Sequence, residues 1–236
     1  SVGGIAGAAG VSALLALGLS PLWAIAAVIV LILAALAKAA PHLLPYGSES
    51  SGPAFAVPHG VVLFIGVLCF IVFLAEGAML DWSAVFLTTE KSLGEAYAGL
   101  GYAAFALTMT VGRLLGDTIV RRLGARRVII LGGLFAALGM ALATLAPNWE
   151  LSLLGYALVG VGCSNIVPVL YTAVGKQTVM PESIAVPAIT TLGYAGILAG
   201  PAAIGFIAHA SSLSLAFLLI AALLLGVAIS GRRVQV

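Results

Sequence analysis

The sequence predicts an all-α membrane protein with about eight transmembrane helices. Hydrophobic residues make up 62% of its 236 positions and charged residues only 8%, whereas a soluble domain carries about a quarter charged residues. Apolar runs long enough to cross a bilayer core of about 30 Å follow one another along most of the chain. This composition excludes a water-soluble fold. The net charge of +2 is too small and too dispersed to indicate nucleic-acid binding.

Prolines, glycines or charged residues separate the apolar runs from one another. The eight predicted spans cover approximately residues 2–17, 21–37, 60–80, 97–115, 128–145, 151–172, 185–207 and 213–230. The first of them is short. Because the chain begins at Ser1 and enters apolar sequence at once, we expect it to be truncated at its N-terminus.

The connections are short except for residues 39–59, which contain four prolines and several serines. Such a composition is typical of a linker. We therefore expect two helices in residues 1–38, a linker at 39–59 and six helices in residues 60–236.

Basic residues indicate the orientation, because cytoplasmic loops of membrane proteins are enriched in Lys and Arg. One set of alternate loops and ends contains Lys38, Arg121, Arg122, Arg126, Arg127, Lys176, Arg232 and Arg233. The other set contains Lys91 as its basic residue. The linker and the C-terminus are predicted to be cytoplasmic.

Glu76 is the clearest candidate for chemistry, because an ionisable residue deep in a membrane span is costly and usually functional. Cys69 and Ser83 lie on the same helical face. A structural alternative is that the carboxyl group hydrogen-bonds a neighbouring helix backbone or reaches water near the outer surface.

Polar residues in three further spans are candidates for lining a cavity. Tyr102 and Arg113 share a stripe of the fourth span, although Arg113 could instead extend towards the cytoplasmic interface. In the sixth span, Pro168 frees a backbone carbonyl and bends the helix, and Asn165 lies one turn earlier. Asn165 is suited either to gating and binding or to holding helices together.

The seventh span has two distinct faces. Thr190 and Tyr194 lie on one of them, and Gly193, Gly196 and Gly200 lie nearly opposite. Because glycines allow helix backbones to approach closely, we expect tight packing on the glycine face. The polar face either lines a lumen or hydrogen-bonds another helix.

Enzyme chemistry is not expected. The sequence contains no HExxH, DDxxD, GxSxG or Walker motif, so we predict neither catalysis nor ATP hydrolysis. Cys69 and Cys163 lie singly within apolar runs, without metal-ligand spacing. Neither a metal nor a cofactor is predicted.

Residues 112–127 hold five of the ten basic residues and read Gly-Arg-x-x-Gly-Asp, followed by Arg-Arg-x-Gly-x-Arg-Arg. This stretch resembles the signature of the major facilitator superfamily, in the long form found in the second half of bacterial permeases near the fucose-permease group. Segments 76–82, 164–168 and 193–201 support the resemblance. Thr118 departs from the pattern, because a basic residue is usual there.

The resemblance implies a fold of two six-helix halves. The chain would then hold the last two helices of the first half, the linker and the complete second half, and the first four helices would be absent. In the family, the Asp of the signature contacts a neighbouring helix and its arginines close the cytoplasmic side. The implied gating set is Gly112, Arg113, Gly116, Asp117, Arg121, Arg122, Gly124, Arg126 and Arg127.

The resemblance also implies secondary active transport of a small, sugar-like solute by alternating access in a bacterial inner membrane. We expect a monomer coupled to protons, with Glu76 as the proton or hydroxyl acceptor. The residues expected to form the solute and proton site with it are Tyr102, Asn165, Thr190 and Tyr194. The alternatives are a membrane sensor or assembly protein that does not transport and, within transport, multidrug efflux.

Overall fold

The computed structural model describes residues 7, 10–11, 13–14, 17–42 and 57–234. In these residues the secondary structure is helical, without strands, which confirms the predicted all-α class. The chain divides into two units, Ser1–Ser51 and Gly52–Val236. Most of the predicted span 2–17 and most of the predicted linker lie outside the described residues.

The described part of the first unit consists chiefly of α2 (Pro21–Ala39), which is followed by the short 3-10 helix η1 (Ala40–His42). Pro21 occupies the first turn, where its fixed φ suits a helix and its missing N–H is not needed. The helix agrees closely with the predicted span 21–37.

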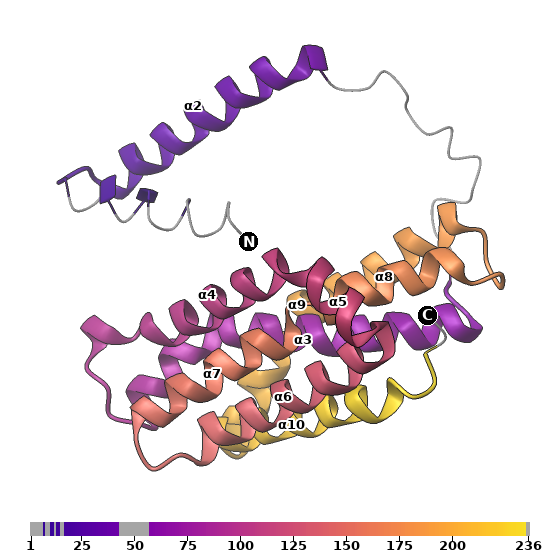
Figure 1. Ribbon diagram of the computed structural model, residues 1–236. Helices are drawn as coiled ribbons and strands as arrows, with labels where there is room; N and C mark the ends of the chain where they lie inside the picture. The colour runs from indigo at the N-terminus through magenta and orange to yellow at the C-terminus, as the bar shows by residue number, and fades with distance from the viewer. Residues whose placement is uncertain (1–6, 8–9, 12, 15–16, 43–56, 235–236) are drawn as a thin grey trace. The chain divides into compact units, whose positions relative to one another are not determined.

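The second unit is a bundle whose helices lie alongside one another (Figure 1). Its elements are α3 (Gly60–Thr89), the 3-10 helix η2 (Glu95–Tyr97), α4 (Leu100–Leu114), α5 (Gly116–Leu123), α6 (Ala125–Leu145), α7 (Trp149–Cys163), α8 (Ile166–Lys176), α9 (Glu182–Ala210) and α10 (Leu213–Ser230). Within the described ranges of both units, six helical stretches are long and apolar enough to cross a membrane, and the bent pair α4 and α5 makes a seventh.

The predicted end of the third span was wrong, because α3 continues past residue 80 as far as Thr89. The prediction placed the end at the charge of Asp81. A charged residue on the exposed side of a helix does not interrupt its backbone hydrogen bonds, and no proline or glycine occurs between Asp81 and Thr89.

Residues 112–127, most of which the prediction placed in the connection between two spans, do not form a loop. They comprise the end of α4, the whole of α5 and the start of α6, and the axes of the first two helices differ by 65°. Leu and Arg favour helix even in a charged stretch. The chain reverses at Gly124, whose φ of 80° lies in the left-handed region that glycine adopts without strain.

The predicted span 151–172 is not one continuous helix. It is broken at Ser164 and Asn165, between α7 and α8. Pro168 follows in the first turn of α8, and it has no N–H to donate to the carbonyl of Ser164 four residues earlier. The proline therefore accounts for the position of the break.

Glycines set the closest helix contacts, as predicted for the seventh span. A Cβ atom added at Gly193 would lie 2.7 Å from the Phe73 ring, and one at Gly200 would lie 2.8 Å from Leu74, so both glycines face α3. Gly155 has the same role between α7 and α6, where an added Cβ would lie 2.5 Å from the backbone nitrogen of Ala143. Close packing on the glycine face of α9 is thus confirmed, and the structure identifies α3 as its partner.

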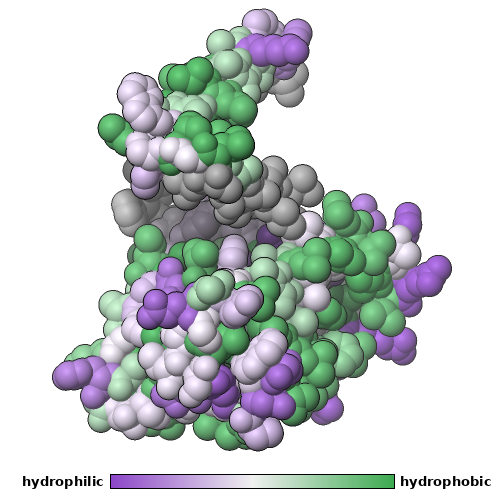
Figure 2. Space-filling view, turned by 90° about the vertical axis from the view of Figure 1, so that its left-hand side faces the viewer, coloured by the Kyte–Doolittle hydropathy of each residue, from purple (hydrophilic) through white to green (hydrophobic). Residues whose placement is uncertain are grey.

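On the face of the second unit that Figure 2 shows, hydrophobic residues lie between separate clusters of hydrophilic residues. On α9, Leu198 and Phe206 are 79% and 76% exposed. Such large apolar exposure is typical of a surface that contacts lipid or another protein segment.

Candidate functional site

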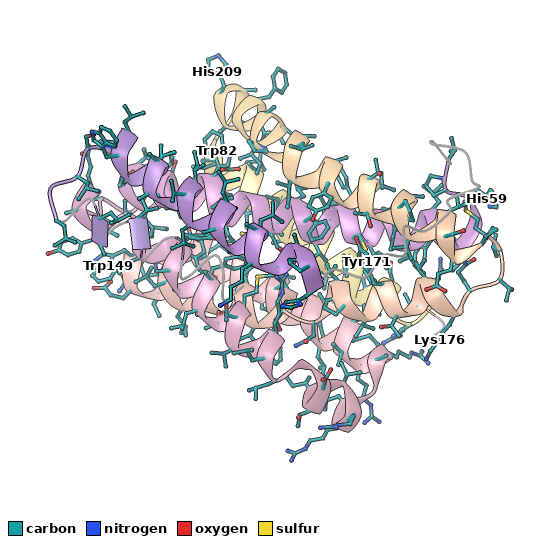
Figure 3. The ribbon with its side chains drawn as sticks, turned by 90° about the horizontal axis from the view of Figure 1, so that it is seen from above. His59, Trp82, Trp149, Tyr171, Lys176 and His209 are labelled. Atoms are coloured by element: carbon teal, nitrogen blue, oxygen red, sulfur yellow. The ribbon has the colours of Figure 1, made fainter. Side chains whose placement is uncertain are left out.

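A cavity of about 490 Å³ opens among α3, α4, α8 and α9, a volume within the usual range for small-molecule sites. The lining residues are Phe73, Glu76, Arg113, Val167, Pro168, Tyr171, Tyr194 and Ile197. Tyr171 comes from α8 and lies near the middle of the bundle (Figure 3). The cavity is mostly apolar, with a few polar groups converging on it.

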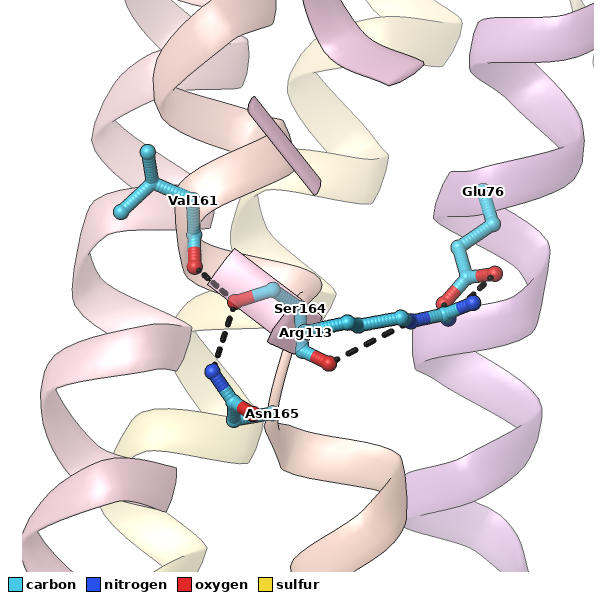
Figure 4. A network of polar contacts seen from close by, with 5 residues as sticks. All are labelled: Glu76, Arg113, Val161, Ser164 and Asn165. Carbon is cyan, nitrogen blue, oxygen red and sulfur yellow. Dashed lines mark hydrogen bonds and ion pairs between the residues drawn. The ribbon is translucent and has the colours of Figure 1, made fainter. Parts of the chain in front are cut away.

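Glu76 and Arg113 form an ion pair in this cavity (Figure 4). The Arg113 Nη2 atom donates to Oε1 at 3.2 Å and to Oε2 at 3.4 Å. Only 15% of the Glu76 side chain and 33% of the Arg113 side chain are exposed. Of the two alternatives for Arg113, the structure shows the one in which its side chain lines the cavity. The side chain does not extend towards the cytoplasmic interface.

Arg113 also contacts the break between α7 and α8. Its Nε atom donates to the backbone carbonyl of Ser164 at 3.4 Å. This is the carbonyl that Pro168 leaves without a helical N–H partner. The predicted consequence of the proline, a freed carbonyl inside the membrane, is therefore confirmed, and a guanidinium group uses it.

Asn165 lies behind the cavity wall and does not line it. Its Nδ2 atom donates to the Gly112 carbonyl at 2.9 Å and to Ser164 Oγ at 3.0 Å. The side chain fits because Gly112 and Gly116 have no Cβ. A Cβ at Gly112 would lie 2.5 Å from Ser164 Oγ, and one at Gly116 would overlap Asn165 Oδ1.

Aromatic groups form a further part of the cavity lining. The rings of Phe73 and Tyr194 are stacked, with centroids 5.5 Å apart. Tyr171 Oη lies 2.8 Å from Thr190 Oγ1, which itself donates to the Val186 carbonyl at 2.7 Å. A threonine hydroxyl has one proton, and Thr190 donates it to the Val186 carbonyl. Tyr171 is therefore the donor in this pair. Thr190 accepts from it and does not itself line the cavity.

Of the predicted solute and proton residues, Glu76 and Tyr194 line the cavity. Tyr102 lies outside it, exposed, with its ring 6.0 Å from that of Phe105. The prediction missed Phe73 and Tyr171. Phe73 precedes Glu76 by three residues, so the helical spacing of α3 could have identified it.

The predicted gating residues lie on α4, α5 and the start of α6. The side chains of Arg121, Arg122, Arg126 and Arg127 are exposed, and Arg121 Nη2 donates to Thr118 Oγ1 at 3.3 Å. Asp117 lies in the first turn of α5, where its negative charge favours that helix's own N-terminus. Within the described ranges it forms no ion pair with a neighbouring helix.

The site offers proton and hydrogen-bond chemistry. A carboxylate can accept a proton, a guanidinium group can only donate hydrogen bonds, and the tyrosines add hydroxyl groups and ring faces. No set of three or more His, Cys, Asp or Glu converges as a metal site in the part of the chain that the structure describes.

Comparison with known proteins agrees with this architecture. The family model described as Major Facilitator Superfamily matches residues 65–232, well over half of the chain. An uncharacterized MFS-type transporter of Yersinia pestis is 57% identical over 99% of this chain, which spans 61% of that relative's length.

Two more distant relatives come from rhizobia. Membrane protein MosC of Rhizobium meliloti is 34% identical over 68% of this chain and 40% of its own length. The uncharacterized transporter y4wD of Sinorhizobium fredii is 31% identical over 73% of this chain and 46% of its own length. The apolar helices and these relatives identify a multi-pass membrane protein. The chain belongs to the major facilitator superfamily.

Proposed function

We propose that the protein is a secondary active transporter that moves a small organic solute by alternating access and exchanges a proton at Glu76. The observation that carries the proposal is the Glu76–Arg113 ion pair, which joins α3 to α4 inside a cavity of solute size. Intramembrane ionisable residues that face a cavity commonly mark solute or proton pathways.

Protonation of Glu76 would couple proton binding to a change in helix contacts. A proton from water converts the carboxylate into a neutral carboxyl group, which removes its electrostatic attraction to Arg113. The contact between α3 and α4 is then weakened, and the guanidinium group can donate to a solute. Loss of the proton on the other side of the membrane restores the pair.

The groups that line the cavity favour a polar solute that also has an apolar face. Tyr194 and Phe73 present stacked rings, and Tyr171, Glu76 and Arg113 supply hydrogen-bonding groups. Ring faces bind apolar surface while the polar groups fix orientation. A sugar-like molecule has both features, in keeping with the resemblance to fucose permeases.

We further propose that the protein lies in a bacterial inner membrane as a monomer, with the linker and C-terminus in the cytoplasm. The helix α5, the start of α6 and the end of α8, which carry the exposed arginines and Lys176, lie towards the same end of the bundle (Figure 1). This distribution supports the orientation through the positive-inside rule. Cysteine labelling from each side at Arg233 and Glu95 tests it.

Uptake driven by an imposed pH gradient tests the proton step. The full protein, reconstituted in lipid vesicles, is compared with Glu76→Gln across sugars, organic acids and drug-like cations. We expect Glu76→Gln to abolish gradient-driven uptake and to retain exchange of pre-loaded solute, because the amide carries no titratable proton.

Glu95→Gln is the matched control, since Glu95 is an exposed residue in η2, away from the cavity. Unchanged gradient-driven uptake by Glu76→Gln would remove Glu76 from the mechanism. Absence of flux for every solute class in the unaltered protein would favour the sensor or assembly alternative.

A further inference from the structure

Two interrupted helices meet directly behind the ion pair. One interruption is the bend between α4 and α5, and the other is the break between α7 and α8. Helix ends leave carbonyl and N–H groups without helical partners, which is costly inside a membrane unless other groups satisfy them. The contacts at this meeting point therefore show which groups satisfy the free helix ends.

Two consecutive residues at the end of α4, Gly112 and Arg113, contact two consecutive residues at the α7–α8 break, Ser164 and Asn165. Asn165 donates to the carbonyl of Gly112 at 2.9 Å, and the carbonyl of Ser164 accepts from Arg113 Nε at 3.4 Å. Ser164 Oγ in turn accepts from Asn165 Nδ2 and donates to the Val161 carbonyl at 2.8 Å. The α4 end and the α7 end are thus joined by a short polar network (Figure 4).

This junction is closely packed as well as hydrogen-bonded. Asn165 is only 6% exposed and Ser164 only 2%. The glycines at positions 112 and 116 leave no room for a methyl group against these two side chains. The first two glycines of the family signature therefore have a local role in this chain, which is to admit Ser164 and Asn165.

We propose that Asn165 is a positioning residue that fixes the α4–α5 bend to the α7–α8 break and thereby holds Arg113 towards Glu76. Asn165 does not touch the solute. The end of α4 and the α7–α8 break move together, and the ion pair opens by displacement of α3, which carries Glu76 and packs against α9. The inference rests on the proposed function only for its consequence in transport.

Thiol accessibility tests the junction without any transport measurement. Cys163 lies two residues before Asn165 and is fully buried, and Cys69 is equally buried on α3. Each thiol is measured alone in the full protein, in a Cys69→Ala or a Cys163→Ala background, by its alkylation rate with N-ethylmaleimide.

We expect Asn165→Leu to raise the alkylation rate of Cys163 by about tenfold, because Leu cannot make the two hydrogen bonds of the Asn165 amide to the Gly112 carbonyl and to Ser164 Oγ. The rate at Cys69 should stay unchanged, because α3 is not part of the junction. Gly116→Ala should reproduce the effect by displacing Asn165. Gly226→Ala is the control, since a Cβ there meets no atom within 4 Å.

The pH profile of uptake distinguishes positioning from mere folding. Asn165→Leu should move the profile in the same direction as Arg113→Gln, and Asn165→Gln, which keeps the amide donor, should recover most of the unaltered profile. Equal alkylation of Cys163 in Asn165→Leu and the unaltered protein would overturn the proposal. If Asn165→Leu raises the alkylation rate of Cys163 but Glu76→Gln leaves gradient-driven uptake unchanged, the positioning role of Asn165 is retained and the proton step at Glu76 is rejected.

Discussion

Glu76 on α3 and Arg113 on α4 are 37 positions apart in the chain, yet Oε1 and Nη2 lie 3.2 Å apart inside a bundle of apolar helices. The pair is partly exposed to its cavity and is not fully buried. Removing one partner should therefore cost less than it would in a pair sealed in a protein core, where the remaining charge would be fully desolvated.

The two partners should be coupled energetically. Glu76→Gln or Arg113→Gln alone leaves one charge in an apolar cavity, and we expect each to lower the free energy of unfolding by about 1–3 kcal/mol. The double variant should lose less than the sum of the two. Thermal unfolding of the four proteins in detergent measures the coupling, and strictly additive losses would contradict it.

A methyl group at Gly196 should separate α3 from α9. The added Cβ would overlap the Phe70 carbonyl and lie 3.1 Å from the backbone nitrogen of Leu74, and backbone atoms cannot move aside cheaply. We expect Gly196→Ala to cost about 1–3 kcal/mol of stability.

Gly226→Ala is the matched helical control, because open space surrounds that position. It should gain about 0.5–1 kcal/mol through helix propensity. A change of the same sign in both variants would contradict close packing at Gly196.

Lys91 should stabilise the end of α6. Its Nζ atom donates to the carbonyls of Thr144 at 3.0 Å and Ala146 at 2.6 Å, and it lies 5.3 Å from the centre of the Phe86 ring. Lys91→Met keeps the length of the side chain and removes the charge, so we expect a loss of about 1–2 kcal/mol. Lys176→Met, at an exposed site, should change the melting temperature little; equal shifts would refute the role of Lys91.

Tyr156 should tolerate loss of its hydroxyl group. The side chain is fully buried, and among the described residues its Oη atom has no hydrogen-bond partner. Because an unsatisfied buried polar group is costly, Tyr156→Phe should leave stability unchanged or raise it by about 1 kcal/mol.

Tyr171→Phe provides the contrast, since it removes the 2.8 Å hydrogen bond to Thr190. Hydrogen bonds between membrane helices are worth about 0.6 kcal/mol on average, so a small loss is expected. Calorimetry of both variants measures the difference, and destabilisation by Tyr156→Phe would show that its hydroxyl group is in use.

Local patterns predicted several features of the site correctly. The glycines of α9 predicted a closely packed face, and Pro168 predicted a freed carbonyl, because both depend on residues at fixed helical spacing. The candidate Glu76 was identified from its charge in an apolar run. The helical spacing of α8 could have identified Tyr171, which lies three residues after Pro168.

Other features escaped prediction because they depend on how separate helices are placed. Arg113 had two alternatives until its inward contacts with Glu76 and Ser164 were known. Asn165 was expected in the cavity wall but lies behind it, bonded to Gly112. Lys91 was counted only as an exception to the charge rule, and its contacts join segments 53 and 55 residues apart.

The sequence by itself determined that the chain is helical, that it is built for a membrane and where most of its spans lie, because hydropathy and helix period act over about 20 residues. Only the tertiary structure decided which polar groups meet. Ion pairs and hydrogen bonds extend over about 3 Å, so the rotation and depth of each helix select the partner of Glu76 and turn Asn165 away from the cavity.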